Sequence, residues 1–235
     1  MAVMGLNATS CFKRVGGEII CNFCEGKLIK YGNSSANKQR YCCKNCNKTQ
    51  VENYSYNAYD QNINQSIIVL TKEGLGIRST SRVLRISTTT LLKRIIAIAK
   101  NISQPPIKKY QEYELDEMRT FIKKKKSLIW LVYAVNKKTR EIVSFNIGKR
   151  TNITLKFVIK SLELSQATKI YTDKLKNYKY LISKEFHSTK YRGTNYIERK
   201  NLTIRTHLKR FNRKTICFSR NLAILSAIAK LYFWA

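Results

Sequence analysis

The sequence predicts a multi-domain chain in which a small metal-stabilised module and an all-α unit precede a larger α/β domain. Three observations predict this order. Two Cys-x-x-Cys pairs lie within residues 19–50, apolar residues recur at helical spacing over residues 61–100, and strand-like apolar runs alternate with helical patterns over residues 110–235. Residues 1–18 carry no motif and are interpreted as an N-terminal extension. Both prolines fall within residues 101–109, which indicates a domain boundary.

The cysteine pairs predict a four-cysteine zinc site. Cys21 and Cys24 are separated by eighteen residues from Cys43 and Cys46, which is within the range for a zinc ribbon. Cys43 is chosen over Cys42 because it restores the two-residue gap to Cys46. The intervening residues predict a hairpin of two short strands, too small to fold on its own core without metal. The alternative is four structural thiols or disulfides.

Residues 61–100 predict three short helices. The first covers Ile63–Glu73, the second is capped by Ser79 with Val83 and Leu84 facing inward, and the third covers Thr88–Lys100. A glycine-containing turn and a hydroxyl-rich start to the last helix are typical of a helix-turn-helix, although a plain three-helix unit is the alternative. The residues expected to contact DNA are Arg78, Arg82, Ser87, Thr88, Thr89 and Lys93.

From Tyr110 onward the pattern predicts strands and then alternating helices and strands. Strands are expected at residues 112–118, 128–135 and 141–147, followed by a helix to Leu162, a strand at 169–172 and a helix at 175–183. A short strand near residues 186–189, a helix over residues 197–213 and a last helix at 222–233 complete the domain. This order predicts an RNase H-like α/β fold.

Three acidic residues in this domain are candidate metal ligands. The chain has only three aspartates; Asp116 lies in the first strand of the domain and Asp173 ends a later one, while Glu198 opens a helix. Parallel neighbouring strands would bring these carboxylates together, and Mg²⁺ or Mn²⁺ would relieve their repulsion. Glu114 shares a strand face with Asp116, whereas Glu117 points away. A surface ion pair is the alternative role for Glu198.

The charge of the chain predicts a polyanionic partner. Lys and Arg total 45 against 14 Asp and Glu, which gives a formal net charge of +31. Double-stranded DNA fits better than a membrane surface, because no basic amphipathic helix stands apart from a core. The order of apolar and basic residues at the N-terminus does not fit a signal peptide, so we expect a cytoplasmic, nucleoid-associated protein. Further basic residues around Glu198 are expected to contact DNA: Arg199, Lys200, Lys209 and Arg210.

Several motifs resemble those of IS1-family insertion-sequence transposases. They lie at residues 40–46, 76–84, 115–118, 130–139, 148–151, 171–173, 197–211 and 213–219, and the last two form a long and highly specific pattern. The resemblance implies a zinc ribbon, a helix-turn-helix and a DDE catalytic domain in which Asp116, Asp173 and Glu198 match the catalytic acids. Arg205 matches the basic residue seven positions after the glutamate. Lys174 stands where the family usually has glycine.

The resemblance implies a Mg²⁺-dependent transposase that binds the terminal inverted repeats of its element and joins the cleaved ends to target DNA. It would act as a homo-oligomer on DNA. The alternative is a catalytically inactive DNA-binding repressor derived from a transposase. An RNase H-like nuclease without sequence preference would not need two N-terminal DNA-binding units.

Overall fold

The computed structural model describes residues 13–15, 18–35, 37–51, 56–190, 193–213, 215–217 and 219–235. The chain forms two compact units, residues 1–66 with 84–87 and residues 67–83 with 88–235. No described helix is both long enough and apolar enough to span a membrane.

The N-terminal module contains two small antiparallel sheets. Strands β1 (Lys13–Val15) and β2 (Glu18–Ile20) form a hairpin, so the predicted extension contains a strand. Strands β3 (Leu28–Asn33), β4 (Gln39–Cys43) and β5 (Thr49–Val51) form the second sheet in that order. The sequence predicted β3 and β4 but not β5, because three residues carry too little pattern to identify.

The predicted all-α region contains three helices and a short 3-10 helix, η1 (Asn57–Tyr59). The helices are α1 (Ile63–Lys72), α2 (Ile77–Leu84) and α3 (Thr88–Asn101). Helix α2 begins two residues before Ser79, and Val83 is 59% exposed, so the prediction that Val83 faces inward was wrong. The buried residues of α2 are Thr80 and Ser81, which share a face with Ile77 and Leu84 at helical spacing.

The C-terminal domain is built on a five-stranded sheet of order β10-β9-β6-β7-β8. Its long strands are β6 (Glu112–Ile122), β7 (Lys124–Asn136) and β8 (Ile142–Gly148), which pair antiparallel. Strand β9 (Lys169–Thr172) pairs parallel with β6, and the two-residue β10 (His187–Ser188) pairs parallel with β9. Three antiparallel strands followed by parallel strands on the far side of the first is the RNase H-like arrangement.

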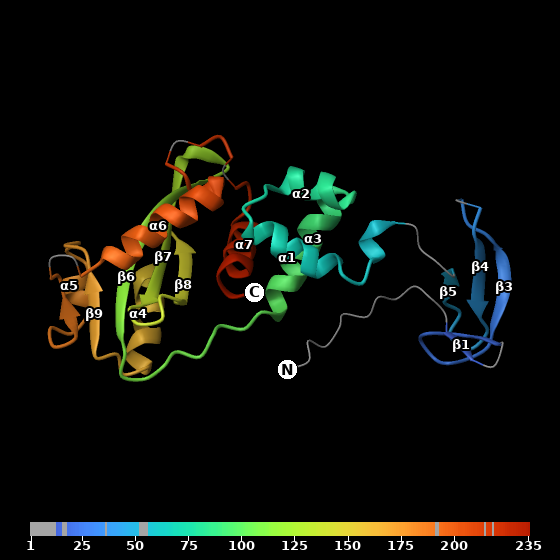
Figure 1. Ribbon diagram of the computed structural model, residues 1–235, viewed down its shortest axis with the longest axis horizontal. Helices are drawn as coiled ribbons and strands as arrows, with labels where there is room; N and C mark the ends of the chain where they lie inside the picture. The colour runs from blue at the N-terminus through green and yellow to red at the C-terminus, as the bar shows by residue number, and fades with distance from the viewer. Residues whose placement is uncertain are drawn as a thin grey trace. The chain divides into compact units, whose positions relative to one another are not determined.

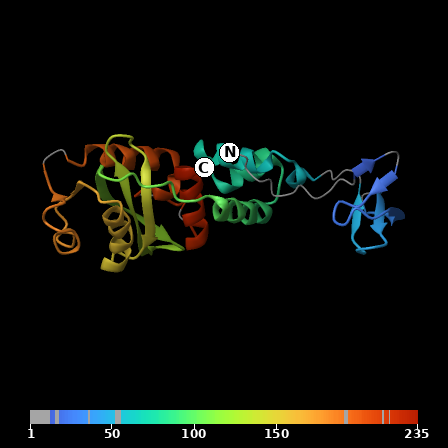
Figure 2. The same cartoon turned by 90° about the horizontal axis from the view of Figure 1, so that it is seen from below.

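Helices cover both faces of this sheet (Figure 1). Helix α4 (Asn152–Leu164) lies on one face, where its apolar residues pack with Tyr113 and Leu115 of β6. Helix α6 (Asn195–His207) crosses the other face, and Figure 2 shows the sheet between α4 in gold and α6 in orange-red. The short α5 (Tyr178–Leu181) follows β9, and α7 (Leu222–Trp234) ends the chain.

The helix predicted around Glu198 is shorter than expected. Helix α6 ends at His207, and Lys209–Phe211 form the 3-10 helix η2. Leu208 leaves the helical region, with φ −101° and ψ 85°, although its N–H still bonds to the carbonyl oxygen of Ile204. The apolar residues at helical spacing along this stretch, Ile197, Ile204, Leu208 and Phe211, are nevertheless all buried, so the bend changes the path of the backbone and keeps the packing.

Candidate active site

Parallel pairing of β6 with β9 brings two of the predicted acids together. Leu115 is the register partner of Thr172, so Asp116 and Asp173 follow side by side where β9 ends. One carboxylate oxygen from each of Asp116, Glu117 and Asp173 lies within 4.8 Å of the others. Three hard oxygen donors at this spacing fit a divalent cation such as Mg²⁺ or Mn²⁺.

Glu198 is not part of that trio. It lies in the first turn of α6, is exposed, and accepts a hydrogen bond from the Thr194 hydroxyl at 3.2 Å. Its negative charge nevertheless reaches Asp116 and contributes to raising the pKa of that carboxyl. Of the three acids predicted from the sequence, the structure therefore clusters two and places the third nearby on the helix above them.

Asp116 is held by α6 as well as by its own strand. Its Oδ1 accepts a hydrogen bond from the backbone N–H of Glu117 at 2.7 Å, and its Oδ2 accepts one from the Asn201 amide at 2.6 Å. The Asn201 carbonyl oxygen in turn accepts a hydrogen bond from the Tyr133 hydroxyl at 2.8 Å. Burial raises the pKa of Asp116, the two N–H donors oppose this rise, and the charges of Asp173 and Glu198 add to it.

Asn201 was not predicted as a site residue. It lies three residues after Glu198 and four before Arg205, so all three project from neighbouring positions on one side of α6. That spacing was the available signal. The sequence alone did not show that this side of the helix faces Asp116, because helix orientation is set by tertiary packing.

Glu117 lies in the acidic trio although its side chain leaves the opposite face of β6. Its side chain is 1% exposed and accepts a hydrogen bond from Arg150 Nε at 3.3 Å. The Arg150 guanidinium lies 4.5 Å from the centre of the Trp130 ring. Burial raises the pKa of Glu117 and the positive charge of Arg150 opposes the rise. Because side chains alternate between the two faces of a strand, the sequence predicted that Glu117 points away from Asp116. It did not show that β9 ends at Thr172, so that Asp173 lies beyond the end of the strand and can approach Glu117.

Glu114 fixes the start of α6 over the sheet. It is fully buried, and its Oε2 accepts a hydrogen bond from the backbone N–H of Ile197 at 2.7 Å. Burial raises its pKa, and this N–H opposes the rise. A buried carboxylate beneath the first turn of a helix complements the positive end of the helix dipole. Glu114 therefore sets where Glu198 and Asn201 stand relative to Asp116.

Arg205 lies two turns after Glu198, as predicted, and is close enough to Asp116 for their charges to interact. Its Nε is buried and has no hydrogen-bond partner among the residues that the structure describes, and burial lowers the pKa of Arg205. A buried donor without a partner is costly, so a phosphate oxygen would suit this position. Lys174 follows Asp173 and is not among the residues with a positive φ, so glycine is not required there.

The four predicted cysteines come together in the N-terminal module. The Sγ atoms of Cys21 and Cys46 are 3.6 Å apart and those of Cys24 and Cys43 are 3.3 Å apart, and all four lie within 4.8 Å of one another. Cys42 Sγ instead faces a backbone carbonyl. The two knuckles match: the backbone N–H groups of Glu25 and Asn47 bond to the carbonyl oxygens of Cys21 and Cys43, and both residues have φ near +55°.

The protonation of these thiols also fits a cation. Burial raises the pKa of Cys21, but N–H groups and neighbouring thiols lower it to about 6. A hydrogen bond from Gly26 lowers the pKa of Cys24, but the thiols of Cys43 and Cys46 raise it to about 12. The Cys21 thiolate thus forms readily, and its negative charge disfavours ionisation of a second thiol. A bound Zn²⁺ would stabilise all four cysteines as thiolates.

The residues predicted to contact DNA are all at least partly exposed. The predicted residues on or beside α2 and α3 are all exposed: Arg78, Arg82, Ser87, Thr88, Thr89 and Lys93. In the C-terminal part of the chain, Arg199 and Lys209 are exposed and Lys200 is half-buried. Arg210 differs, because burial lowers its pKa and its Nη1 donates to the Ser219 hydroxyl at 2.9 Å. Arg210 is therefore engaged within the domain.

Comparison with known proteins identifies the family. Residues 112–233, just over half of the chain, match the family described as IS1 transposase. The chain belongs to the IS1 transposase family. Over 111 residues it is 39% identical to the insertion element iso-IS1n protein InsB of Shigella dysenteriae and 32% identical to the insertion element IS1 protein InsB of Shigella flexneri. Each match covers 47% of this transposase-family chain and 85% of the relative.

Remote similarity to retroviral integrases adds little to this assignment. A simian T-cell lymphotropic virus intasome chain aligns with a TM-score of 0.38 and 18% identity, over 69% of this chain and 66% of that chain. The HTLV-2 integrase catalytic core in complex with magnesium aligns with a TM-score of 0.35 and 19% identity, over 55% of this chain and 86% of that chain. Such scores do not establish a shared fold, so the fold assignment rests on strand order and direction.

Proposed function

We propose that this member of the IS1 transposase family is an active DNA transposase. It would bind the terminal inverted repeats of its element through the N-terminal zinc ribbon and the helix-turn-helix, cut the DNA there, and join the ends to target DNA. The observation that supports this most directly is the parallel register that sets Asp116 beside Asp173 beneath α6. Mg²⁺ or Mn²⁺ bound there would activate a water or a 3′-hydroxyl and stabilise the leaving oxygen.

The chain's own residues would prepare this chemistry. Asp116 and Asp173 supply oxygen ligands, and Asn201 fixes the direction of the Asp116 carboxylate. Arg205 offers a buried guanidinium N–H near Asp116 that can hold a phosphate oxygen. The third ligand is proposed to be Glu198, whose charge acts on Asp116 from the first turn of α6.

A nicking assay tests this proposal. Wild-type protein and the variants Asp116→Asn, Asp173→Asn and Glu198→Gln are incubated with Mg²⁺ and a duplex that carries a terminal repeat. We expect nicking and strand transfer by the wild type and a loss of about 10²-fold or more in each variant. Glu163→Gln removes an exposed acid on α4 and serves as the matched control.

Glu117→Gln decides which glutamate completes the site. If Glu198 is the ligand, Glu117→Gln keeps most of the activity, whereas loss in Glu117→Gln with activity retained in Glu198→Gln would assign that role to Glu117. Mg²⁺-independent DNA binding without any nicking by the wild type would contradict the enzyme and support a repressor.

A further inference from the structure

Strands β6 and β7 extend beyond both of their neighbours as a two-stranded ribbon. The last register pair of β6 with β9 is Leu115 with Thr172, and the last pair of β7 with β8 is Trp130 with Gly148. From Thr120 to Ile129 the two strands therefore pair with each other alone, apart from a single bridge between Ile122 and Ser219 (Figure 1). The ribbon leaves the sheet at the end that carries Asp116 and Asp173.

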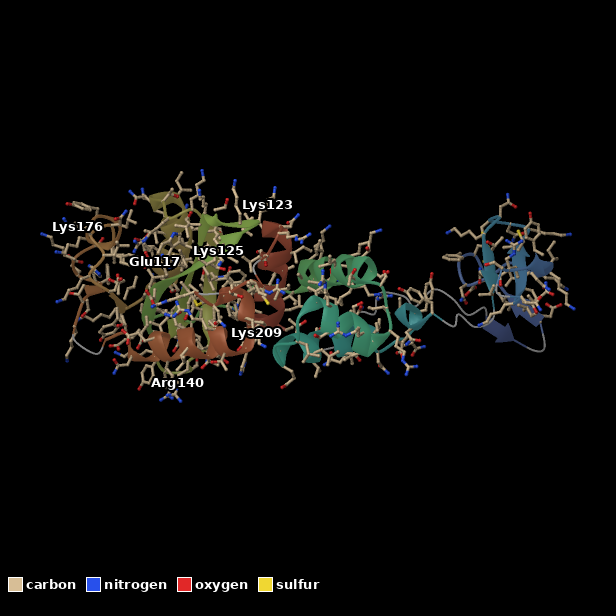
Figure 3. All side chains as sticks on the ribbon, turned by 90° about the horizontal axis from the view of Figure 1, so that it is seen from above. Glu117, Lys123, Lys125, Arg140, Lys176 and Lys209 are labelled. Carbon is tan, nitrogen blue, oxygen red and sulfur yellow. The ribbon has the colours of Figure 1, made fainter. Side chains whose placement is uncertain are left out.

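The tip of this ribbon carries four consecutive exposed lysines, Lys123 to Lys126. Figure 3 shows Lys123 and Lys125 at the far end of the ribbon that contains Glu117. Within the described part of the chain, no acidic side chain forms an ion pair with any of the four. Lys123 has φ +61°, a left-handed conformation that favours glycine, and it forms the turn between β6 and β7.

The ribbon is fixed to the domain and is not a free loop. The backbone N–H of Lys123 donates to the carbonyl oxygen of Ser219 at 2.9 Å, and Ile122 forms a parallel bridge with Ser219. The Thr120 hydroxyl donates to the carbonyl oxygen of Arg210 at 2.8 Å, and Arg210 holds the Ser219 hydroxyl. Since β6, Arg210 and Ser219 together hold the tip in place, the fold sets its distance from the acids.

We propose that the lysines at the ribbon tip bind the DNA backbone at a set distance from the scissile phosphate. Ile122 lies six positions after Asp116 in β6, which corresponds to about 20 Å along the strand. At about 3.4 Å per base pair, a duplex that follows the ribbon meets the lysines roughly six base pairs from the acids. This inference rests on the proposed function, because it takes Asp116 and Asp173 as the position of the cut.

The first test compares salt dependence in the full-length protein without divalent metal. The variant Lys124→Gln/Lys125→Gln/Lys126→Gln removes three charges from the tip. Its control, Lys138→Gln/Lys156→Gln/Lys169→Gln, removes three exposed lysines located on α4 or at the opposite end of the sheet. The slope of log association constant for DNA against log salt concentration is measured for each protein. We expect this slope to become shallower by about 3 in the tip variant and to change by less than about 1 in the control. Equal slopes for the two variants would overturn the proposal.

The second test uses pre-nicked duplexes that are shortened in steps on either side of the nick. We expect wild-type affinity to fall once one arm is shorter than about six base pairs. The tip variant should not respond to shortening of that arm, and circular dichroism should show that it is folded. A length dependence that persists in the tip variant would contradict the inference. Absence of nicking by the wild type would instead contradict the proposed function, and the slope comparison would still hold.

Discussion

At the scale of single residues, the candidate site depends on side chains that orient other side chains. Asp116 is fixed by a backbone N–H on one oxygen and by Asn201 on the other, and Asn201 is itself oriented by Tyr133. The acids are visible in the sequence because aspartate is rare in this chain. Their orienting partners are not, because asparagine and tyrosine are common and their contacts span more than sixty positions.

Asn201→Ala should weaken metal binding without unfolding the protein. The change removes the amide that donates to Asp116 and leaves the Tyr133 hydroxyl with only the Ile197 carbonyl oxygen as acceptor, so stability should fall by about 1–3 kcal/mol. Titration of Mn²⁺ followed by melting temperature would measure the effect. The exposed neighbour Leu202→Ala should change neither property. Unchanged Mn²⁺ affinity in Asn201→Ala would show that Asp116 needs no such support.

The acidic trio should make stability depend on pH. Burial raises the pKa values of Asp116 and Glu117, so the folded state binds protons more tightly than the unfolded state does. This contribution to stability is fully present at a pH below the carboxyl pKa of the unfolded chain, about 4. It is lost as the pH rises through the higher pKa values of the folded state.

Asp116→Asn should therefore raise the melting temperature of the metal-free protein at pH 8 more than at pH 4. Mg²⁺ should stabilise the wild type at pH 8 and should stabilise Asp116→Asn much less. Thermal melts at the two pH values, with chelator and then with Mg²⁺, would measure both effects. An equal gain at both pH values would mean that burial of the charge is not the cause.

At the scale of elements, pattern predicted the long strands and helices well and the short ones poorly. Strands β6, β7 and β8 and helices α4 and α7 follow clear apolar periods, and each was expected within a few residues of its observed bounds. Strands β1, β2 and β5 were not expected, and α5 has four residues where nine were predicted. Whether such short segments form strands or helices depends on the segments that they pack against in the folded domain. The sequence alone does not show which segments those are.

The extension of β6 beyond residue 118 was also unexpected. Its additional residues, Arg119 to Ile122, are followed by a lysine run that reads as a loop. The strand persists because Thr120 is fully buried and its hydroxyl donates to the carbonyl oxygen of Arg210, in the segment that follows α6. A contact between positions ninety residues apart decided the secondary structure here.

The stability of the protein should depend on Glu114 as a hydrogen-bond acceptor and not on its negative charge. Glu114→Ala leaves the Ile197 N–H buried without a partner and should lower stability by about 1–3 kcal/mol. Glu114→Gln keeps an oxygen for that N–H and should be neutral or slightly stabilising at pH 7, because burial disfavours the charged form. Urea denaturation of both variants would test this. Equal destabilisation by Ala and Gln would show that the charge itself holds α6.

Removal of zinc should unfold the N-terminal module and leave the C-terminal domain folded. The module's core consists of Cys21, Leu28, Tyr41 and Cys43 with a few partly buried neighbours, which is too small to be stable alone. A strong chelator, or Cys46→Ser, should expose residues 18–51 to protease and abolish zinc binding. Cys42→Ser should retain zinc, because Cys42 does not face the cluster. Protease resistance after chelation would contradict a structural metal.

At the scale of the whole molecule, charge dominates. With 45 basic and 14 acidic residues, the formal net charge is +31, and three of the acids, Asp116, Glu117 and Asp173, lie together in one cluster. Composition alone therefore predicted the class of partner. The composition does not show which basic residues bind DNA, because their arrangement depends on the fold.

DNA binding by the full chain should be steeply dependent on salt. If the protein contacts six or more phosphates, affinity for a duplex should fall by about 10³-fold or more between 50 and 200 mM salt. Fluorescence anisotropy with a terminal-repeat duplex and a scrambled duplex would measure this loss. The scrambled duplex should show a similar slope and a lower affinity throughout. A shallow slope on both duplexes would indicate that few of the basic residues reach the backbone.

The parallel pairing of β6 with β9 has a consequence for synthesis of the protein. Strands β6, β7 and β8 are consecutive and can assemble as soon as they leave the ribosome, but β9 must cross α4 to reach β6, and α6 comes later still. A nascent chain therefore holds Asp116 long before Asp173 and the covering helix exist. The candidate site can form only after α6 has been made, so polypeptides that stop before α6 should lack the DNA cleavage proposed for the chain.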